Sequence, residues 1–449
     1  MATKDNNWTH LIVGLGQTGL SVAHYLGRQG ISFAVVDSRE NPPGKAELLT
    51  TFPTVMTQFG EFQTTTFINA AHLIVSPGVA VANPAIQAAK QQGAEIIGDI
   101  ELFVREATAP IIAITGSNGK STVTTLVAEM AEMAGLQVYA GGNLGTTSLD
   151  LLQKPAADLY VMELSSFQLE TTYSLHAIAA VILNLCEDHM DRYAHFDDYV
   201  AAKQVIFNNS DCVVINRDDV LVKALTPPLS STLVSFGLDT PKMNQYGFND
   251  GYLMKGKQCL MHCREMKVQG EHNIANALSA LALGEAANIP MPAMLAAIRA
   301  FTGLEHRTQW LAEIDTVQWF NDSKGTNVGA TIAALAGLSG KTVLIAGGQA
   351  KGADFSPLAD IVRQKARAVI LIGEDREEIA TVLAKKEHSE TKTPIFYADT
   401  MQQAVELSRQ VAQINDNVLL SPACASFDMF RSYIHRGEVF MDAVRSLPQ

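Results

Sequence analysis

Short apolar runs alternate with helix-like segments along most of the chain. The runs Leu11–Val13 and Phe33–Val36 are fully apolar, and Leu20–Arg28 between them has helical spacing. A similar run at His72–Val75 precedes a helix-like segment at Pro84–Gln92. Strands that alternate with helices in this way are typical of βαβ units and a parallel sheet. The pattern therefore predicts an α/β domain at the start of the chain.

A second block of alternating segments opens near Asp99. It predicts strands at 110–114, 159–162 and 179–183, and helices at 120–134, 196–208 and 272–286. Between Leu233 and Val268 the apolar runs are short and are broken by Gly, Asn and Asp, which is typical of antiparallel hairpins. The block thus combines parallel α/β units with a small hairpin region.

A third block begins near Leu304 and repeats the α/β pattern. Its predicted elements are strands at 343–346, 368–372 and 418–420 and a terminal helix at 426–445. The length of 449 residues also favours about three domains, at roughly 150 residues each. We predict an α/β protein of three domains, with boundaries at residues 1–98, 99–303 and 304–449.

The composition indicates which classes of protein the chain fits. Apolar residues make up 47% of the chain and charged residues 18%, as in ordinary folded domains. The net charge of -13 argues against a dedicated nucleic-acid binder, whose affinity depends on Lys and Arg meeting phosphates. The first ten residues lack the apolar run of a signal peptide, and no segment reaches the ~20 apolar residues that cross a bilayer. We expect a cytoplasmic protein in which the five scattered cysteines stay reduced.

A phosphate-binding loop follows the first strand of the second block. The residues at 115–122 read TGSNGKST and open a helix, so that backbone N–H groups and the helix N-terminus face a phosphate. Lys120 is placed to reach the β- and γ-phosphates of a nucleotide, and the Ser121 hydroxyl to ligate Mg²⁺. The loop departs from the strict motif, because Ile114 replaces its first glycine and Gly116 comes two residues later. The strand before it and the helix after it favour a nucleotide site over a chance turn.

Acidic and histidine side chains end the neighbouring strands of this block. Glu163 follows the run 159–162, where it could hold Mg²⁺ near a γ-phosphate. The next strand leads into NLCEDHMD at 184–191, in which His189 stands among acids. The alternatives are a helix N-terminal charge for the glutamate and a structural role for the histidine. From the residues alone, Lys203 is interpreted as an ordinary helix lysine.

Two further glycine-rich turns follow strands. Residues 14–19 read GLGQTG and Asp37 ends the next strand, which together match the dinucleotide fingerprint of a Rossmann-type domain. NAD binding is the direct interpretation, and binding of another nucleotide or diphosphate is the broader one. In the third block, residues 347–351 read GGQAK, where a plain tight turn and a ligand site are equal alternatives.

These motifs, taken in order, resemble those of the Mur ligase family of peptidoglycan synthesis, and the resemblance covers essentially the whole chain. The matching segments are 14–19, 76–78, 115–122, 142–145, 163–170, 187–193, 270–276, 306–307, 321–327 and 421–427. The resemblance implies a Rossmann-like N-terminal domain, a central P-loop ATPase-like domain and a Rossmann-like C-terminal domain. It further implies a monomeric, ATP-dependent ligase that uses two Mg²⁺ ions and adds D-glutamate to UDP-N-acetylmuramoyl-L-alanine.

The resemblance also assigns roles to individual residues. The UDP end of the substrate, rather than NAD, would be bound by Gln17, Thr18, Ser38, Arg39, Gly78 and Asn143. ATP would be bound by Gly116, Ser117, Asn118, Gly119, Lys120, Ser121, Thr122, Asn273, Asn276, Arg307, Asp322 and Lys324. The amino acid would be held by Thr326, Lys351, Ser426, Phe427 and Tyr433. Magnesium would be held by Ser121, Glu163, His189 and a carbamylated Lys203. The implied catalytic residues are Lys120, His189, Lys203 and Lys324.

Three other functions are alternatives to this one. A different Mur-type or folylpolyglutamate-type ligase would take another acceptor, although the chain lacks the Asp-Asn-Pro-Arg string of the ligases that add diaminopimelate or lysine. A regulatory nucleotide-binding module would bind ATP without amino-acid-dependent turnover. An NAD oxidoreductase would rest on the first glycine loop alone and would give the second phosphate loop no role.

Overall fold

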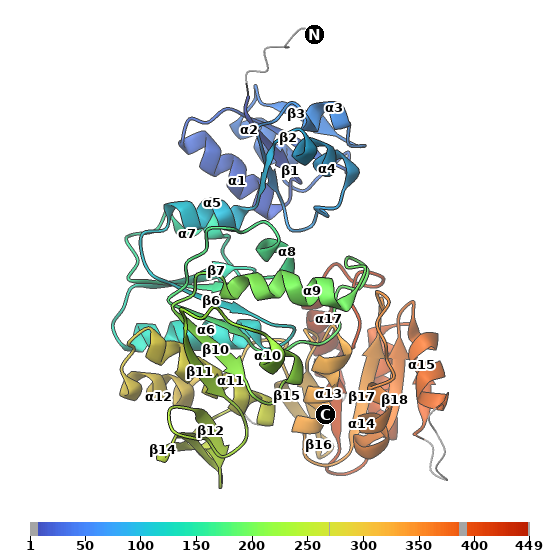
Figure 1. Cartoon of the computed structure of the whole chain (residues 1–449). Coiled ribbons are helices and arrows are strands. Elements are labelled where there is room, and N and C mark those ends of the chain that lie inside the picture. The colour runs from blue at the N-terminus through green and yellow to red at the C-terminus, as the bar shows by residue number, and fades with distance from the viewer. Residues whose placement is uncertain (1–7, 269, 386–392, 448–449) are drawn as a thin grey trace.

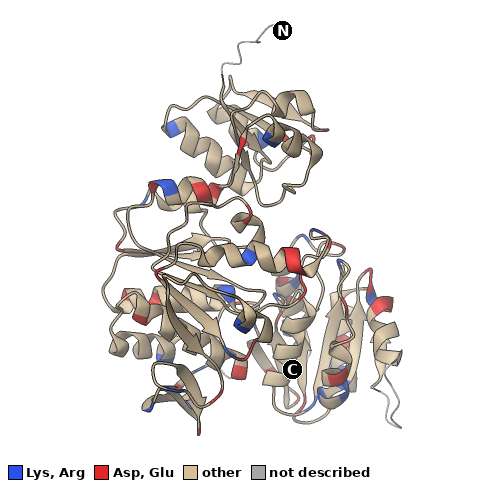
Figure 2. Ribbon diagram, in the orientation of Figure 1, with Lys and Arg blue, Asp and Glu red and all other residues tan. Residues whose placement is uncertain are grey.

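The computed structural model describes residues 8–268, 270–385 and 393–447 and arranges them as three α/β domains (Figure 1). The N-terminal domain lies at one end of the central domain, and the third domain lies beside the central one. Most charged residues lie on helices and loops rather than within the strands (Figure 2). The predicted three-domain α/β fold is confirmed, while the exact boundaries stay a prediction. No helix in the described ranges is long and apolar enough to cross a membrane.

The N-terminal domain is built on one parallel sheet. Its elements are β1 His10–Val13, α1 Gln17–Arg28, β2 Phe33–Asp37, α2 Lys45–Thr51, β3 Met56–Phe59, α3 Thr64–Phe67, β4 His72–Val75, α4 Pro84–Gln91 and β5 Glu95–Ile97. Over the described residues the strand order is β3-β2-β1-β4-β5. Side chains of β1 alternate between two apolar clusters, so both faces of the sheet are covered. Gly19 is required for this packing, because a Cβ there would lie 1.9 Å from the Gly14 carbonyl oxygen.

The central domain holds the largest sheet. Its helices are α5 Asp99–Glu106, α6 Lys120–Met133, α7 Ser148–Leu151, α8 Ser166–Leu169, α9 Phe196–Gln204, α10 Val220–Ala224, α11 Glu271–Ala286 and α12 Met291–Ala300, with 3-10 turns at Val205–Phe207 and Cys263–Glu265. Its strands are β6 Ile111–Thr115, β7 Val138–Gly142, β8 Leu159–Glu163, β9 Ala179–Ile182, β10 Cys212–Asn216, β11 Thr232–Phe236, β12 Tyr246–Asn249, β13 Tyr252–Lys255 and β14 Gln258–His262. The strand order in the described part is β14-β13-β12-β11-β10-β9-β6-β8-β7. Helix α6 packs against α11 and α12 over one face of this sheet. The ends of β6, β8 and β9, which are neighbours, therefore meet at one edge.

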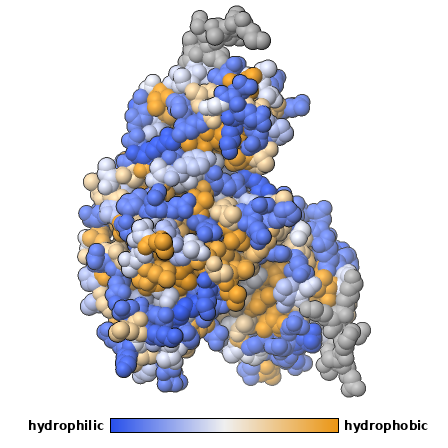
Figure 3. Space-filling model, in the orientation of Figure 1, coloured by the Kyte–Doolittle hydropathy of each residue, from blue (hydrophilic) through white to orange (hydrophobic). Residues whose placement is uncertain are grey.

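The third domain repeats the parallel pattern with one antiparallel edge strand. Its strands are β15 Gln309–Ile314, β16 Val317–Asn321, β17 Thr342–Gly347, β18 Ala366–Ile372, β19 Ile395–Tyr397 and β20 Asn417–Leu420. Its helices are α13 Val328–Gly337, α14 Leu358–Lys365, α15 Arg376–Lys385, α16 Met401–Val411 and α17 Tyr433–Arg445. Among the residues described, the order is β15-β16-β20-β17-β18-β19. Apolar residues are visible where this domain meets the central one (Figure 3).

Some predicted elements differ from the structure. The hairpin prediction for 233–268 holds for β12, β13 and β14 but is wrong for β11, which pairs in parallel with β10. The helix predicted at 426–445 begins only at Tyr433, because Ser432 caps it by accepting a hydrogen bond from the His435 N–H at 3.2 Å. The helix predicted at 196–208 ends at Gln204 and continues as a 3-10 turn.

Candidate active site

The phosphate-binding loop joins β6 to α6 and is held by the segment that follows β9. Gly119, the residue before α6, has φ of 84°, a conformation that favours glycine. The Ser117 N–H donates to the Asn184 carbonyl at 2.9 Å, and the Asn118 N–H donates to Asn184 Oδ1 at 2.8 Å. The Ser117 hydroxyl lies 3.0 Å from the Tyr199 hydroxyl of α9. Protein contacts thus fix the conformation of the loop.

Two lysines, of which Lys203 is buried and Lys120 is partly buried, converge on one peptide carbonyl of this loop. Lys120 Nζ donates to the carbonyls of Gly116 at 2.8 Å and Ser117 at 2.9 Å. Lys203 Nζ, from α9, donates to the same Gly116 carbonyl at 3.0 Å and to Thr115 Oγ1 at 3.3 Å. Burial lowers the pKa of Lys120, and it lowers the pKa of Lys203 well below the ordinary value. The interpretation of Lys203 as an ordinary helix lysine is wrong, because its side chain lies inside the domain under the phosphate loop.

Glu163 ends β8, and His189 lies in the loop that follows β9, so the two residues come from the strands on either side of β6. Glu163 Oε1 accepts a hydrogen bond from Asn143 Nδ2 at 2.7 Å, whereas Oε2 is buried with no hydrogen-bond partner among the described residues. A buried carboxylate oxygen without a donor fits a cation. His189 has φ of 61°, and its Nε2 lies 3.8 Å from Asp188 Oδ2. Burial lowers the pKa of His189, which favours the neutral imidazole that ligates metals.

The protein side chains alone do not form a complete metal cage in the described ranges, where no three His, Cys, Asp or Glu side chains cluster. Mg²⁺ usually keeps few protein ligands and completes its shell with phosphate oxygens and water. The Glu163 carboxylate beside a phosphate loop therefore fits a magnesium ion that is shared with a nucleotide.

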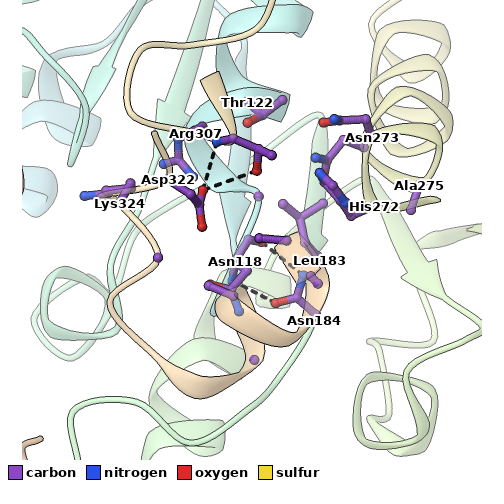
Figure 4. A pocket seen from close by; sticks show the side chains of 18 of the residues that line it. Asn118, Thr122, Leu183, Asn184, His272, Asn273, Ala275, Arg307, Asp322 and Lys324 are labelled. Carbon is purple, nitrogen blue, oxygen red and sulfur yellow. Dashed lines mark hydrogen bonds between the residues drawn. The ribbon is translucent and has the colours of Figure 1, made fainter. Parts of the chain in front are cut away.

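A cavity of about 350 Å³ lies between the phosphate loop, α11 and the third domain. In Figure 4, Arg307, Asp322 and Lys324 lie on one side of it, and His272 and Asn273 on the other. The residues predicted to bind ATP that line it are Asn118, Gly119, Thr122, Asn273, Asn276, Arg307, Asp322 and Lys324. The remaining ones belong to the adjoining loop and first turn of α6: Gly116, Ser117, Lys120 and Ser121. The structure thus brings the predicted ATP-binding residues of two domains to one place.

Hydrogen bonds connect the third domain to the phosphate loop across this cavity. Arg307 Nη2 donates to Ser121 Oγ at 2.7 Å. The amides of Asn118 and Asn327 are paired: Asn118 Nδ2 donates to Asn327 Oδ1 at 3.2 Å, and Asn327 Nδ2 donates to Asn118 Oδ1 at 3.1 Å. These hydrogen bonds join the third domain to the phosphate loop and to the first turn of α6.

Burial shifts the titration of two side chains at this junction. Lys324 Nζ lies 3.9 Å from the centre of the Tyr433 ring, and burial, together with the charges of Arg307 and Lys120, lowers the pKa of Lys324 to about 8. Burial raises the pKa of Asp322 to about 6. Both groups therefore titrate near neutral pH, as groups in functional sites often do.

The predicted UDP-binding residues, except Asn143, lie at the carboxyl edge of the N-terminal sheet, where ligands of parallel α/β sheets bind. They follow β1, β2 and β4: Gln17, Thr18, Ser38, Arg39 and Gly78. Asn143 follows β7 and donates a hydrogen bond to Glu163.

The Asp37 carboxylate is already engaged. Its Oδ2 accepts from the Leu15 N–H at 2.7 Å and from Arg39 Nη2 at 2.7 Å, while its Oδ1 accepts from Arg39 Nε at 2.8 Å. An NAD site requires this acid to bind the ribose 2′-hydroxyl. The geometry therefore argues against the NAD interpretation of the first glycine loop.

The residues predicted to hold the amino acid are only partly brought together. Thr326 and Lys351 line a narrow cleft together with His189. Lys351 Nζ lies 5.8 Å from the centre of the Phe427 ring, which is 66% exposed. Ser426 and Tyr433 do not line this cleft.

Two residues that organise the third domain are not among the predicted site residues. Arg436 is fully buried, and its Nη1 donates to the carbonyls of Cys424 at 3.1 Å and Ala425 at 3.2 Å, while its Nη2 donates to the Ser323 carbonyl at 2.8 Å. Asn327 bridges to the phosphate loop, and it could have been found because it ends the motif at 321–327. Arg436 lies in a helix outside the matched motifs, so no local signal marks it.

The fold and this site define a three-domain enzyme whose P-loop faces a nucleotide-sized cavity beneath its third domain. Three family models match the chain: the Mur ligase MurD-like N-terminal domain at 8–98, the Mur ligase middle domain at 114–284, and the Mur ligase glutamate ligase domain at 306–424. The chain belongs to the Mur ligase family.

Curated relatives match over nearly the whole length. The chain is 52% identical to the UDP-N-acetylmuramoylalanine--D-glutamate ligase of Pseudomonas syringae pv. syringae, with 97% of this chain and 98% of that protein covered. Proteins of the same name from Nitrosococcus oceani and Legionella pneumophila (strain Paris) are 50% and 47% identical, each with 98% of this chain covered and with 97% and 100% of their own lengths.

Solved structures share the fold at low identity. UDP-N-acetylmuramate-alanine ligase MurC from Thermotoga maritima matches with a TM-score of 0.61 and 19% identity, covering 98% of this chain and 99% of that one. Mycobacterium tuberculosis folylpolyglutamate synthase matches with a TM-score of 0.56 and 14% identity, covering 78% and 94%. At these identities the likeness supports the architecture alone.

Proposed function

We propose that the protein joins D-glutamate to UDP-N-acetylmuramoyl-L-alanine at the expense of ATP, in cytoplasmic peptidoglycan precursor synthesis. The observation that carries the proposal is the convergence of Lys120, Lys203 and Glu163 around the phosphate loop, which borders the cavity between the central and third domains. Relatives that are 47 to 52% identical over almost the whole chain bear the name of this reaction.

The chemistry needs activation because a carboxylate is a poor acylating agent. A carboxylate oxygen of the UDP substrate attacks the γ-phosphorus of ATP, which forms an acyl phosphate and releases ADP. The amine of D-glutamate, after losing a proton, then attacks the acyl carbon, and inorganic phosphate leaves with the bonding electron pair. Both steps gather negative charge on phosphoryl and acyl oxygens, so fixed positive charge accelerates them.

The residues around the cavity supply that charge. Lys120 in the loop and Arg307 and Lys324 from the third domain would bind the ATP phosphates and stabilise the charge that develops on them. Asn273 and Asn276 would face the nucleotide from α11.

Two magnesium sites complete the proposal. Ser121, Glu163, His189 and a carbamylated Lys203 would hold the ions, which would neutralise phosphate charge when bound. Lys203 fits this role because its buried Nζ lies beside Thr115 and the Gly116 carbonyl, where a carbamate would reach the phosphate loop. Carbon-13 NMR of the protein in ¹³CO₂-bicarbonate tests this role: a carbamate resonance that disappears in Lys203→Arg is expected, and its absence from the wild-type protein contradicts the carbamate.

The substrates would approach from opposite domains. Gln17, Thr18, Ser38, Arg39, Gly78 and Asn143 would bind the UDP end. The amino acid would be held by Thr326, Lys351, Ser426, Phe427 and Tyr433, and the Lys351 ammonium would pair with a carboxylate. We propose that the enzyme works as a monomer, for which light scattering of the purified protein is the test.

An acceptor assay tests the function. ADP and phosphate release from ATP is measured with UDP-N-acetylmuramoyl-L-alanine, alone and with D-glutamate, L-lysine, D-alanyl-D-alanine or L-alanine. Release that depends on D-glutamate is expected. Release with one of the other acceptors only would replace D-glutamate in the proposal, and ATP binding without acceptor-dependent release would favour the regulatory module.

A further inference from the structure

One arginine of the central domain joins the loop that carries His189 to the N-terminal domain. Arg192 Nη1 donates to the Pro77 carbonyl at 3.0 Å, and its Nη2 donates to the Val79 carbonyl at 2.8 Å. These two carbonyls flank Gly78, which belongs to the proposed UDP-binding set. One guanidinium therefore fixes the turn after β4 from both sides, a bidentate contact that a point charge cannot reproduce.

The same guanidinium also packs against an aromatic ring that contacts His189. It lies 4.3 Å from the centre of the Phe167 ring, on α8. That ring lies 4.8 Å from the His189 imidazole and 5.9 Å from the Tyr193 ring. The Arg192 N–H donates to the His189 carbonyl at 2.8 Å and so closes the turn in which His189 has its positive φ.

The turn that Arg192 fixes is exposed at Gly78, where a ligand can approach the backbone. Gly78 is exposed, and a Cβ added to it would meet no atom within 4 Å. The turn itself is closed by the Val79 N–H, which donates to the Ser76 carbonyl at 2.9 Å. With its outer carbonyls bound to Arg192, the turn keeps one orientation relative to the central domain.

We propose that Arg192 is a positioning residue that couples the UDP-substrate turn to the His189 loop. It would not touch the reacting atoms. It would hold the N-terminal domain so that the carboxylate at the far end of the UDP substrate meets the phosphate loop in one geometry. The inference rests on the proposed function, since it concerns the same substrate. The ATP cavity is lined by other segments, so ATP binding should not depend on Arg192.

Steady-state kinetics of Arg192→Gln and Arg192→Lys test the inference. For Arg192→Gln we expect KM for UDP-N-acetylmuramoyl-L-alanine to rise about tenfold or more and kcat to fall, with KM for ATP within about twofold of wild type. Arg192→Lys keeps one donor group and should restore part of the loss. Arg28→Gln, at an exposed arginine in the last turn of α1, is the matched control and should behave as wild type.

Equilibrium titration with UDP-N-acetylmuramoyl-L-alanine separates this inference from the proposed function. A wild-type protein without D-glutamate-dependent turnover overturns the function, whereas the titration still reports on Arg192. An unchanged dissociation constant in Arg192→Gln overturns the inference, as do equal rises of both KM values, which indicate a general structural defect. If Arg192→Gln does not fold, Arg192→Lys carries the same test, with a rise in KM for the UDP substrate alone as the expected result.

Discussion

At the scale of single residues, the active site brings two lysine side chains to one peptide carbonyl of the phosphate loop. The Gly116 carbonyl accepts hydrogen bonds from both Lys120 and Lys203. Burial and the nearby charge of Lys120 lower the pKa of Lys203. A phosphate would compensate the charge of Lys120, and a carbamate would convert that of Lys203 into a negative one. The proposed reaction requires both changes, and each of them reduces the electrostatic repulsion between the side chains of Lys120 and Lys203.

Replacing the loop lysine should remove the reaction but not the fold. In Lys120→Met the charge that faces the phosphates is lost, and we expect kcat to fall by about 10²–10³-fold. Phosphate release measures the rate, and thermal unfolding checks the fold. Lys90→Met, at an exposed lysine of α4, is the control and should keep wild-type activity. Activity of Lys120→Met within tenfold of wild type would show that the loop does not act on phosphate.

The low pKa of Lys324 predicts a pH dependence for ATP use. The charged form binds phosphate, and it is lost as the pH rises through the pKa of about 8. The value of kcat/KM for ATP, which reports groups of the free enzyme, should therefore fall above that pH. Lys324→Arg retains its charge and should move the fall to higher pH. The same profile in both proteins would assign the titration to another group.

Site residues that follow a strand could be predicted from the sequence. Site residues whose role depends on their being buried against other elements could not. Lys120, Glu163 and His189 follow apolar runs, so their positions could be inferred from the pattern of the chain. Lys203 and Arg192 show no such signal, because a lysine in a helix and an arginine in a loop are usually solvated. Only the packing of α9 and of Phe167 reveals their partners.

At the scale of elements, continuous apolar runs predicted the positions of buried strands well. The strand predicted at His72–Val75 is confirmed to the residue as β4, since both faces of that strand are covered. Strands β15 and β16 were missed. Strand β15 lies at the sheet edge and none of its residues is buried, so no continuous apolar run marks it. The parallel pairing of β11 could not be inferred either, because strand direction is set by the neighbour β10 and not by the run itself.

Glu101 of helix α5 should contribute to stability, because its carboxylate binds the segment that follows α8. The buried carboxylate accepts hydrogen bonds from the Tyr173 N–H at 2.7 Å, the Ser174 N–H at 3.0 Å and Arg105 Nε at 2.9 Å. Burial opposes ionisation, but these bonds outweigh it and lower the pKa of Glu101. We expect Glu101→Gln to reduce the free energy of unfolding at pH 7 by about 1–3 kcal/mol.

The pH dependence of that loss follows from the sign of the shift. Because the folded pKa lies below the unfolded one, the stabilisation is complete above the ordinary carboxyl pKa of about 4 and is lost as the pH falls through the lowered value. Urea unfolding at several pH values should thus show wild type and Glu101→Gln converging in acid. Glu132→Gln, at an exposed residue of α6, is the control. A gap between wild type and Glu101→Gln that persists in acid would assign the loss to packing.

At the scale of the whole molecule, the pair of Asn118 and Asn327 holds the third domain against the phosphate loop. Asn327 also caps α13 by accepting a hydrogen bond from the Ala330 N–H at 2.9 Å. Asn327→Ser keeps a capping oxygen but cannot form the paired amide bonds with Asn118. We therefore expect a larger radius of gyration for the ligand-free variant in small-angle X-ray scattering. Its KM for ATP should rise about fivefold, which corresponds to roughly 1 kcal/mol for the lost hydrogen bonds.

Saturation with a non-hydrolysable ATP analogue distinguishes domain closure from local damage. ATP contacts proposed on both domains, including Lys120 and Arg307, would replace the lost amide pair, so wild type and Asn327→Ser should then reach the same radius of gyration. Asn69→Ser, at an exposed asparagine of the N-terminal domain, should match wild type throughout. If Asn327→Ser stays compact without ligand, contacts other than this pair hold the domains together. Nucleotide binding would then not bring the two domains closer.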